Sequence, residues 1–118
     1  MIESEIALRN LDDILGVPGL DGVYVGPNDL ALSMGQVPNA SVLSDEAKAV
    51  LLKVKDAAHA RGRAAGAYCG TAATAGDLAR EGFDLVTPGN DVVLLREAAS
   101  RRLGEFRERL SPRHTVGA

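Results

Sequence analysis

Seven side chains that could do chemistry follow segments of this 118-residue chain that look like β-strands. They are Glu3, Asn28, Asp29, Cys69, Thr71, Asn90 and Asp91. Functional groups of parallel α/β proteins gather at the carboxyl ends of the strands, so we expect these side chains at one rim. Glu3 and Asp29 are 29 minus 3, or 26, residues apart, which suits adjacent parallel strands. Two carboxylates without a nearby His or Cys cluster suit a hard divalent ion such as Mg²⁺ or Mn²⁺. The alternative is a helix-capping Asp and an unrelated Glu.

The stretch 23–30, VYVGPNDL, organises the chain around one predicted strand-to-helix turn. Three β-formers precede Gly26 and Pro27, and a helical apolar period begins at Leu30. The fixed φ of Pro27 suits the first turn of a helix and leaves the amides of Asn28 and Asp29 without helical acceptors. Such a turn can receive an anion, with the Asp29 carboxylate beside it to hold a cation.

The rest of the chain alternates between predicted helices and strands. Ser4 caps a first helix with apolar residues at 8, 11 and 15, which ends at Gly16 and Pro18. The later expected elements are a helix over 28–34, a loop over 36–43, a helix from the Ser44 cap to Gly62, a strand over 64–69, a helix over 72–81, a strand over 83–87 and a helix over 92–110. This alternation predicts a parallel α/β sheet covered by helices.

Two architectures fit this alternation. One is a small doubly wound sheet, and the other is part of a (β/α)₈ barrel, which normally needs about 250 residues. Almost no strand precedes Glu3, so we expect the chain to begin within a βα unit. About four βα units, the first with a truncated strand, would make the C-terminal half of a barrel. The predicted domain spans 1–110, and 111–118 is expected to be a loose tail.

Composition excludes several classes of protein. A net charge of −3, without a basic stripe or aromatic platform, argues against nucleic-acid binding. No apolar run approaches the ~20 residues of a membrane helix, and the first residues lack the pattern of a signal peptide. The single cysteine, Cys69, excludes an internal disulfide. We therefore expect a cytoplasmic protein.

Several motifs of the chain closely resemble the HpcH/HpaI aldolase family, the metal-dependent aldolases of 2-oxo acids related to citrate lyase β chains. The motifs are MIES at 1–4, LDDIL at 11–15, VPGLDGVYVGPNDL at 17–30, SMG at 33–35, AGAYCG at 65–70 and GFDLVTPGND at 82–91. The resemblance spans roughly residues 1–110, and the segment 26–30 is its most specific part.

This resemblance implies a (β/α)₈ barrel and a class II pyruvate-dependent aldolase, a carbon–carbon lyase. Glu3 and Asp29 match the family's metal ligands, and the ion would be Mg²⁺, Mn²⁺ or Co²⁺. It would chelate pyruvate and stabilise its enolate as a Lewis acid. The amides around Asn28 and Asp29 would receive the pyruvate carboxylate, and an aldehyde would be the second substrate. Family members often form oligomers in which the last helix packs on a neighbour, so a homo-oligomer is expected.

The chain departs from the family pattern at several positions. Met1 stands where many members have a substrate-contacting Gln. No position matches the family's catalytic His, its partner Asp or the Arg that stabilises the enolate, so we expect no catalytic residue in this chain and little activity from it alone. His59 is predicted to face solvent and His114 lies in the tail.

The remaining candidates have structural interpretations. Cys69 is predicted to be a small buried side chain, Thr71 a helix cap and Asp91 a loop or cap residue. The arginines of 96–113 indicate a solvated helix face or a subunit contact. Two alternatives to an aldolase stay open: a non-catalytic barrel fragment that assembles with a partner chain or with itself, and a small doubly wound binding domain.

Overall fold

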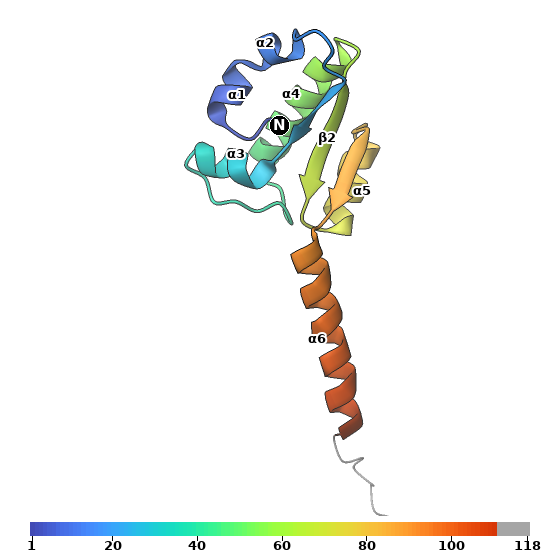
Figure 1. Ribbon diagram of the computed structural model, residues 1–118. Coiled ribbons are helices and arrows are strands. Elements are labelled where there is room, and N and C mark those ends of the chain that lie inside the picture. The colour runs from blue at the N-terminus through green and yellow to red at the C-terminus, as the bar shows by residue number, and fades with distance from the viewer. Residues whose placement is uncertain (111–118) are drawn as a thin grey trace, which may run out of the picture.

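The computed structural model describes residues 1–110 as a short parallel sheet with helices packed on one side and one long helix that projects from the sheet (Figure 1). The helices and strands, in chain order, are α1 (Glu5–Arg9), α2 (Leu11–Leu15), β1 (Gly22–Val25), α3 (Pro27–Ser33), α4 (Asp45–His59), β2 (Ala64–Cys69), α5 (Ala72–Arg80), β3 (Leu85–Pro88) and α6 (Asp91–Leu110). The predicted tail at 111–118, which includes His114, lies outside the described residues.

The three strands are parallel and stand in the order β1-β2-β3. Ile2 extends the sheet by one further parallel bridge to Val25, so four chain segments lie side by side in sequence order. Small residues make the central strand β2, whose Ala65, Ala67 and Cys69 are fully buried. The predicted alternation of parallel strands and helices is confirmed.

Helices cover only one face of this sheet. The inward side chains of β1 and β2 pack with Leu51, Val54 and Ala58 of α4 and with Leu78 of α5 in one apolar core. Because side chains alternate between the faces of a strand, Tyr24, Tyr68, Leu85 and Thr87 point to the other face. No described helix packs on it, and we call it the uncovered face. A doubly wound sheet has helices on both faces, so that alternative was wrong.

The first predicted helix is two short helices instead of one. Asn10 interrupts it at φ −96° and ψ 18°, ending α1 and preceding α2. Ser4 caps α1 as predicted, because its side chain accepts a hydrogen bond from the N–H of Ala7. The break lets Leu11 and Leu15 of α2 enter the core while α1 stays at the surface.

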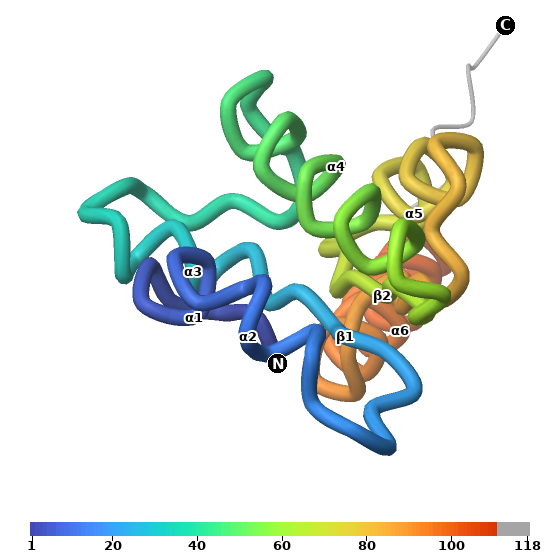
Figure 2. Tube along the Cα trace, turned by 90° about the horizontal axis from the view of Figure 1, so that it is seen from above, coloured from blue at the N-terminus to red at the C-terminus, as the bar shows by residue number. Residues whose placement is uncertain are grey.

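The last helix, α6, has no buried residue. It is 20 residues long, which corresponds to about 30 Å, and it points away from the sheet (Figure 1). Figure 2, seen from above, shows α6 beneath the strands and α4 beside them. None of the helices described over 1–110 is both long enough and apolar enough to cross a membrane.

Candidate metal and substrate site at the strand ends

Glu3 lies beside the carboxyl end of β1. The N–H of Ile2 donates to the carbonyl of Tyr24 at 2.8 Å, and the N–H of Gly26 donates to the carbonyl of Ile2 at 3.1 Å. These two bonds fix Glu3 next to Gly26, where a Cβ would lie only 3.3 Å from Oε2 of Glu3. The half-buried Glu3 carboxylate therefore occupies space that the missing side chain of Gly26 leaves open.

Asp29 lies three residues after Gly26, in the first turn of α3. Gly26 is the N-cap of α3 and Pro27 its first residue, as the sequence pattern predicts. Asp29 is exposed, and no acceptor for its N–H or for that of Asn28 is found among residues 1–110. Glu3 and Asp29 thus follow adjacent parallel strands at the same rim.

The side chain of Asn28 has a structural partner. Its Oδ1 accepts a hydrogen bond from the N–H of Ala40 at 2.9 Å and so ties the loop after α3 to the rim. The N–H of Gly70 donates to the carbonyl of Ala40 at 2.8 Å, which fixes the same loop to the end of β2. Within residues 1–110, the backbone N–H and the side-chain NH₂ of Asn28 are left as donors for an anionic ligand.

The donor set at this rim fits a hard divalent cation. Glu3 and Asp29 offer carboxylate oxygens, and among the described residues no group of three or more His, Cys, Asp or Glu side chains could hold a metal. Mg²⁺ is commonly held by one or two carboxylates and completes its coordination with water and substrate oxygens. Glu3 and Asp29 could supply the one or two carboxylates, and the free backbone amides nearby could hold an anionic ligand of the ion.

An open polar pocket of about 490 Å³ adjoins this rim. Tyr68 of β2 lines it together with residues that follow the three strands, among them Asn28, Ser41, Thr71 and Asn90. Its mixed polar and apolar lining could hold a small polar molecule near Asn28.

Three of the predicted rim residues accept hydrogen bonds from backbone N–H groups at helix starts. The Thr71 hydroxyl accepts a hydrogen bond from the N–H of Thr74 at 3.2 Å and caps α5, as predicted. Asp91 is the first residue of α6, and its carboxylate accepts a hydrogen bond from the N–H of Val92 at 2.9 Å. Asn90 Oδ1 accepts from the N–H of Val93 at 2.9 Å and caps the start of α6.

Cys69 is fully buried, and burial raises the pKa of its thiol. A thiol in that environment is a poor nucleophile at neutral pH, because the reactive species is the thiolate. The prediction that Cys69 is a small buried side chain is confirmed.

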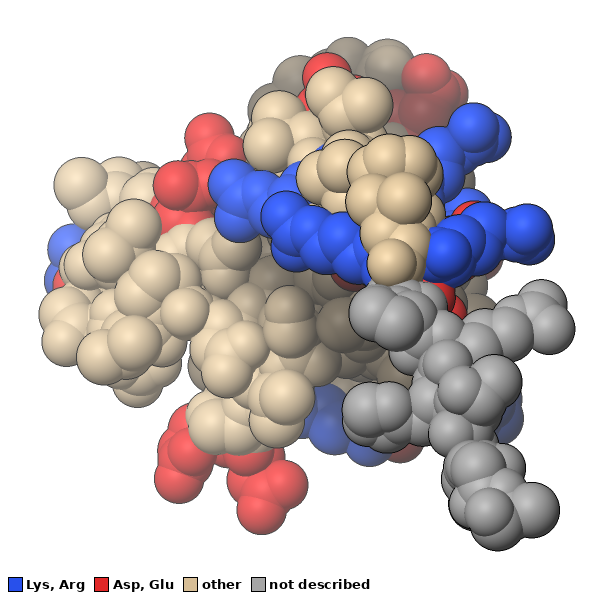
Figure 3. Space-filling model, turned by 90° about the horizontal axis from the view of Figure 1, so that it is seen from below, with Lys and Arg blue, Asp and Glu red and all other residues tan. Residues whose placement is uncertain are grey.

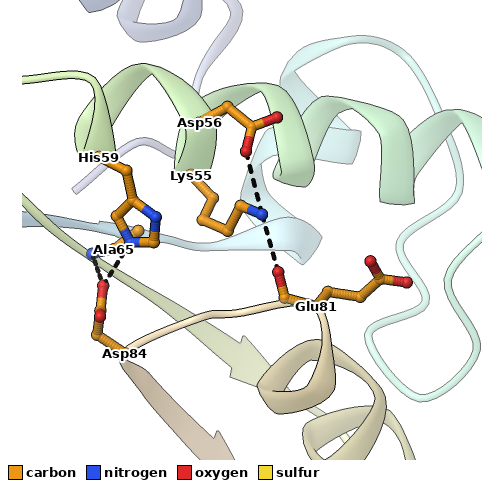
Figure 4. Close-up of polar contacts among 6 residues, drawn as sticks. All are labelled: Lys55, Asp56, His59, Ala65, Glu81 and Asp84. Atoms are coloured by element: carbon orange, nitrogen blue, oxygen red, sulfur yellow. Dashed lines mark hydrogen bonds and ion pairs between the residues drawn. The ribbon is translucent and has the colours of Figure 1, made fainter.

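His59 is exposed, as predicted, and it also contacts a neighbouring carboxylate. Its Nε2 lies 2.8 Å from Oδ2 of Asp84, and the same oxygen accepts a hydrogen bond from the N–H of Ala65 at 2.8 Å (Figure 4). The hydrogen bond from Ala65, followed by that from His59, lowers the pKa of Asp84. This pair joins the end of α4 to the sheet near its amino end, away from the rim.

Sequence reasoning also missed a hydroxyl pair on the uncovered face. The hydroxyls of Tyr24 and Thr87 are 2.5 Å apart, although they come from β1 and β3. The available signal was a glycine, Gly66, inside a strand pattern, which often marks a close approach of other groups. The strand register was needed to identify those groups.

Comparisons with known proteins agree with this arrangement. The family model for HpcH/HpaI aldolase/citrate lyase matches residues 1–98. The chain is 40% identical over 107 residues to a hydroxypyruvate/pyruvate aldolase of Rhizorhabdus wittichii, covering 91% of this chain and 43% of that protein. It is 38% identical over 110 residues to a 2-keto-3-deoxy-L-rhamnonate aldolase of Escherichia coli, covering 90% and 39% of the two chains.

A solved structure shows the same fold. It is the crystal structure of an HpcH/HpaI aldolase/citrate lyase family protein from Burkholderia cenocepacia, with a TM-score of 0.80 and 30% identity, and the match covers 90% of this chain and 40% of that chain. The chain thus spans about two-fifths of the length of the relatives it matches. The predicted fold, parallel strands alternating with helices as in the C-terminal half of a (β/α)₈ barrel, agrees with these matches. The chain belongs to the HpcH/HpaI aldolase/citrate lyase family.

Proposed function

We propose that this chain supplies the metal-binding and carboxylate-binding part of a carbon–carbon lyase that cleaves or forms aldols of 2-oxo acids. The observation that supports it is the placement of Glu3 beside Gly26, at the strand next to the one that leads to Asp29. Relatives named as pyruvate and 2-keto-3-deoxy-L-rhamnonate aldolases make pyruvate and an aldehyde the proposed substrates.

Glu3 and Asp29 would hold Mg²⁺ or Mn²⁺, with Co²⁺ as a further candidate. A bound divalent ion would supply a Lewis acid that stabilises negative charge developing on the keto oxygen of pyruvate. The N–H groups of Asn28 and Asp29 would bind the pyruvate carboxylate and orient it against the rim. Oriented N–H donors of this kind hold an anion without reorganisation during the reaction.

Metal titration tests the first part of this proposal. Mn²⁺ affinity is measured by electron paramagnetic resonance. It should fall at least tenfold in Glu3→Gln and in Asp29→Asn. Asp13→Asn is the matched control, because Asp13 is exposed on α2 and remote from the rim. Circular dichroism should show that all variants stay folded. Equal Mn²⁺ affinity in all four proteins would contradict the proposed ligands.

The second part concerns the missing acid and base. We propose that the 118 residues alone catalyse little or no aldol reaction, since no His or Arg of residues 1–110 lines the pocket at the strand ends and His59 is bonded to Asp84 near the amino end of the sheet. The assay supplies Mg²⁺ or Mn²⁺, pyruvate and a short aldehyde, and follows pyruvate consumption. Robust turnover by the chain alone would overturn this proposal.

A second candidate function is that of a barrel fragment that assembles with a partner chain or with a second copy. The uncovered face and the free edge of β3 favour it, because unpaired strands and exposed apolar side chains invite association. A homo-oligomer and a cytoplasmic location both stay predictions. Native mass spectrometry separates the candidates: a monomer that binds Mn²⁺ favours the metal-binding aldolase part, and an oligomer without Mn²⁺ affinity favours the fragment.

A further inference from the structure

The last residue of α3, Ser33, connects the two segments that carry the proposed metal ligands. Its Oγ accepts a hydrogen bond from the N–H of Glu5, the first residue of α1, at 2.9 Å. Glu5 comes two residues after Glu3, and Ser33 comes four residues after Asp29. Residues four apart lie on the same side of a helix, so Asp29 and Ser33 share one side of α3. A single hydrogen bond therefore joins the backbone after Glu3 to the helix that presents Asp29.

The segment from Glu3 to Glu5 runs along α3. At one end Glu3 lies against Gly26, the N-cap of α3, where a Cβ would be 3.2 Å from Cβ of Glu3. At the other end Glu5 contacts Ser33, the last residue of that helix. Figures 1 and 2 both show α1 beside α3. The segment that carries Glu3 is thus held at both ends of α3.

The N–H of Glu5 needs an acceptor from outside its own helix. It belongs to the first turn of α1, and N–H groups of a first turn have no acceptor within the helix. The neighbouring Ser4 hydroxyl accepts from the N–H of Ala7 instead. Among residues 1–110, the Ser33 hydroxyl is the acceptor found for the Glu5 N–H. Removal of this hydroxyl would release the start of α1 from α3.

The Glu3 carboxylate depends on backbone contacts for its position. It forms no hydrogen bond or ion pair with any residue in the part of the chain that the structure describes. On one side of it, the fully buried Ile2 is hydrogen-bonded at the end of β1 through both its N–H and its carbonyl. On the other side, only Ser4 separates Glu3 from Glu5. The bond to Ser33 is therefore the second of two backbone restraints around Glu3.

We propose that Ser33 is a positioning residue for the metal site. Its hydroxyl restrains the backbone at Glu5 and so keeps the Glu3 carboxylate directed toward the ion that Glu3 and Asp29 would share. Ser33 does not touch the ion and acts only through Glu3. This inference rests on the proposed function, because it assumes that Glu3 and Asp29 are the ligands. The bond is exposed and joins neutral groups, so its loss should lower metal affinity about three- to tenfold.

The Mn²⁺ affinity of serine variants, measured by electron paramagnetic resonance, tests this role. Ser33→Ala should bind Mn²⁺ about three- to tenfold more weakly than the parent chain. Ser33→Thr keeps the hydroxyl and should keep the affinity of the parent chain. Ser44→Ala is the matched control, because it removes a serine hydroxyl that accepts from the N–H of Ala47 at the start of α4. It should lower the free energy of unfolding in urea at least as much as Ser33→Ala and leave Mn²⁺ affinity unchanged.

Double variants show whether Ser33 acts through Glu3. In a Glu3→Gln background, Ser33→Ala should cause no further loss of Mn²⁺ affinity, because the positioned carboxylate is already absent. In an Asp29→Asn background the loss should persist. Exchange of the Glu5 N–H with solvent, followed by NMR without metal, should be faster in Ser33→Ala than in the parent chain or in Ser33→Thr.

Several outcomes would overturn the inference. They are a parent-like affinity in Ser33→Ala, an affinity in Ser33→Thr as weak as in Ser33→Ala, an equal loss in Ser44→Ala, and a full additional loss in the Glu3→Gln background. A parent chain without Mn²⁺ affinity contradicts the proposed function and this inference together. A parent chain that binds Mn²⁺ no better than Ser33→Ala, but better than Glu3→Gln and Asp29→Asn, contradicts only the role of Ser33.

Discussion

At the scale of single residues, Gly26 controls the space available to a candidate metal ligand. A Cβ at Gly26 would lie 3.2 Å from Cβ and 3.3 Å from Oε2 of Glu3. Gly26→Ala should displace the Glu3 carboxylate and weaken Mn²⁺ binding roughly tenfold, the size of effect expected from residues that orient metal ligands. Gly104→Ala is the control, because nothing lies near a Cβ there. Unchanged Mn²⁺ affinity in Gly26→Ala would show that Glu3 is not a ligand.

Asp84 gives the chain a pH-dependent contact. Its pKa is lowered by the hydrogen bonds from Ala65 and His59, so the folded state favours the carboxylate. The resulting stabilisation is present above the unfolded pKa of about 3.9 and is lost as pH falls through the lower folded pKa. Urea unfolding at several pH values between 2 and 6 measures this effect. As the pH falls, Asp84→Asn should lose less free energy of unfolding than the parent chain. If the free energy of unfolding depended on pH equally in the parent chain and in Asp84→Asn, this prediction would be wrong.

Some residue roles could be predicted because they depend on local sequence. Thr71 caps α5 and Cys69 is buried, and both follow from a turn residue before a helix and a small residue ending a strand. The His59–Asp84 and Tyr24–Thr87 contacts join residues 25 and 63 positions apart. Such contacts depend on the register between strands and on how α4 lies across the sheet, which no local pattern specifies.

At the scale of elements, the strands and helices were predicted to within a few residues, and the main error was the first helix. The apolar spacing at Leu8, Leu11 and Leu15 is helical on both sides of Asn10, so the pattern gives no sign of a break. Asn10 ends α1 because its conformation suits a helix end better than a helix interior. Tertiary packing of α2 in the core then fixes the change of direction.

Contacts between elements also hold α4 over the start of β3. Lys55 of α4 donates to the carbonyl of Glu81 at 2.8 Å and contacts Asp56 at 3.0 Å (Figure 4). Lys48 lies 2.7 Å from Glu81, and the pKa of Glu81 is lowered by this hydrogen bond and charge. These contacts explain why the segment between α5 and β3 lies against α4.

The packing of β1 against β2 depends on Gly66. An Ala there would meet Tyr24 Cδ2 at 2.7 Å and the carbonyl of Leu85 at 3.2 Å, so Gly66→Ala should lower the free energy of unfolding by about 1–3 kcal/mol. Gly76→Ala in α5 is the opposite case, because a Cβ there would meet only the side chain of Arg80, at 3.7 Å. This variant should raise the free energy of unfolding by about 0.5–1 kcal/mol. Urea denaturation measures both. In a Tyr24→Ala background the cost of Gly66→Ala should shrink, and an unchanged cost would exclude the ring as its cause.

At the scale of the whole molecule, α6 is the least integrated element. Apolar residues recur every three or four positions on one side of it, with Ala99 between Leu95 and Leu103. The large ones are all more than half exposed: Val92, Leu95, Leu103, Phe106 and Leu110. Figure 3, seen from below, shows basic side chains gathered beside uncharged ones on this side of the molecule. Most of the stability of a helix in a protein comes from packing of its apolar side against a partner. The amphipathic pattern could be predicted from sequence, but its lack of contact with the sheet could not.

We expect this apolar side of α6 to be covered by a second copy in solution. Sedimentation equilibrium should show that the parent chain associates as its concentration rises. The double variant Leu103→Glu with Phe106→Glu should be shifted toward monomer, because it places charges in the apolar surface. Ser100→Glu adds a charge outside that surface and should associate like the parent. If the double variant also associates like the parent, the uncovered face of the sheet is the contact instead. If the parent is monomeric at every concentration, exposed apolar residues on α6 do not mediate self-association.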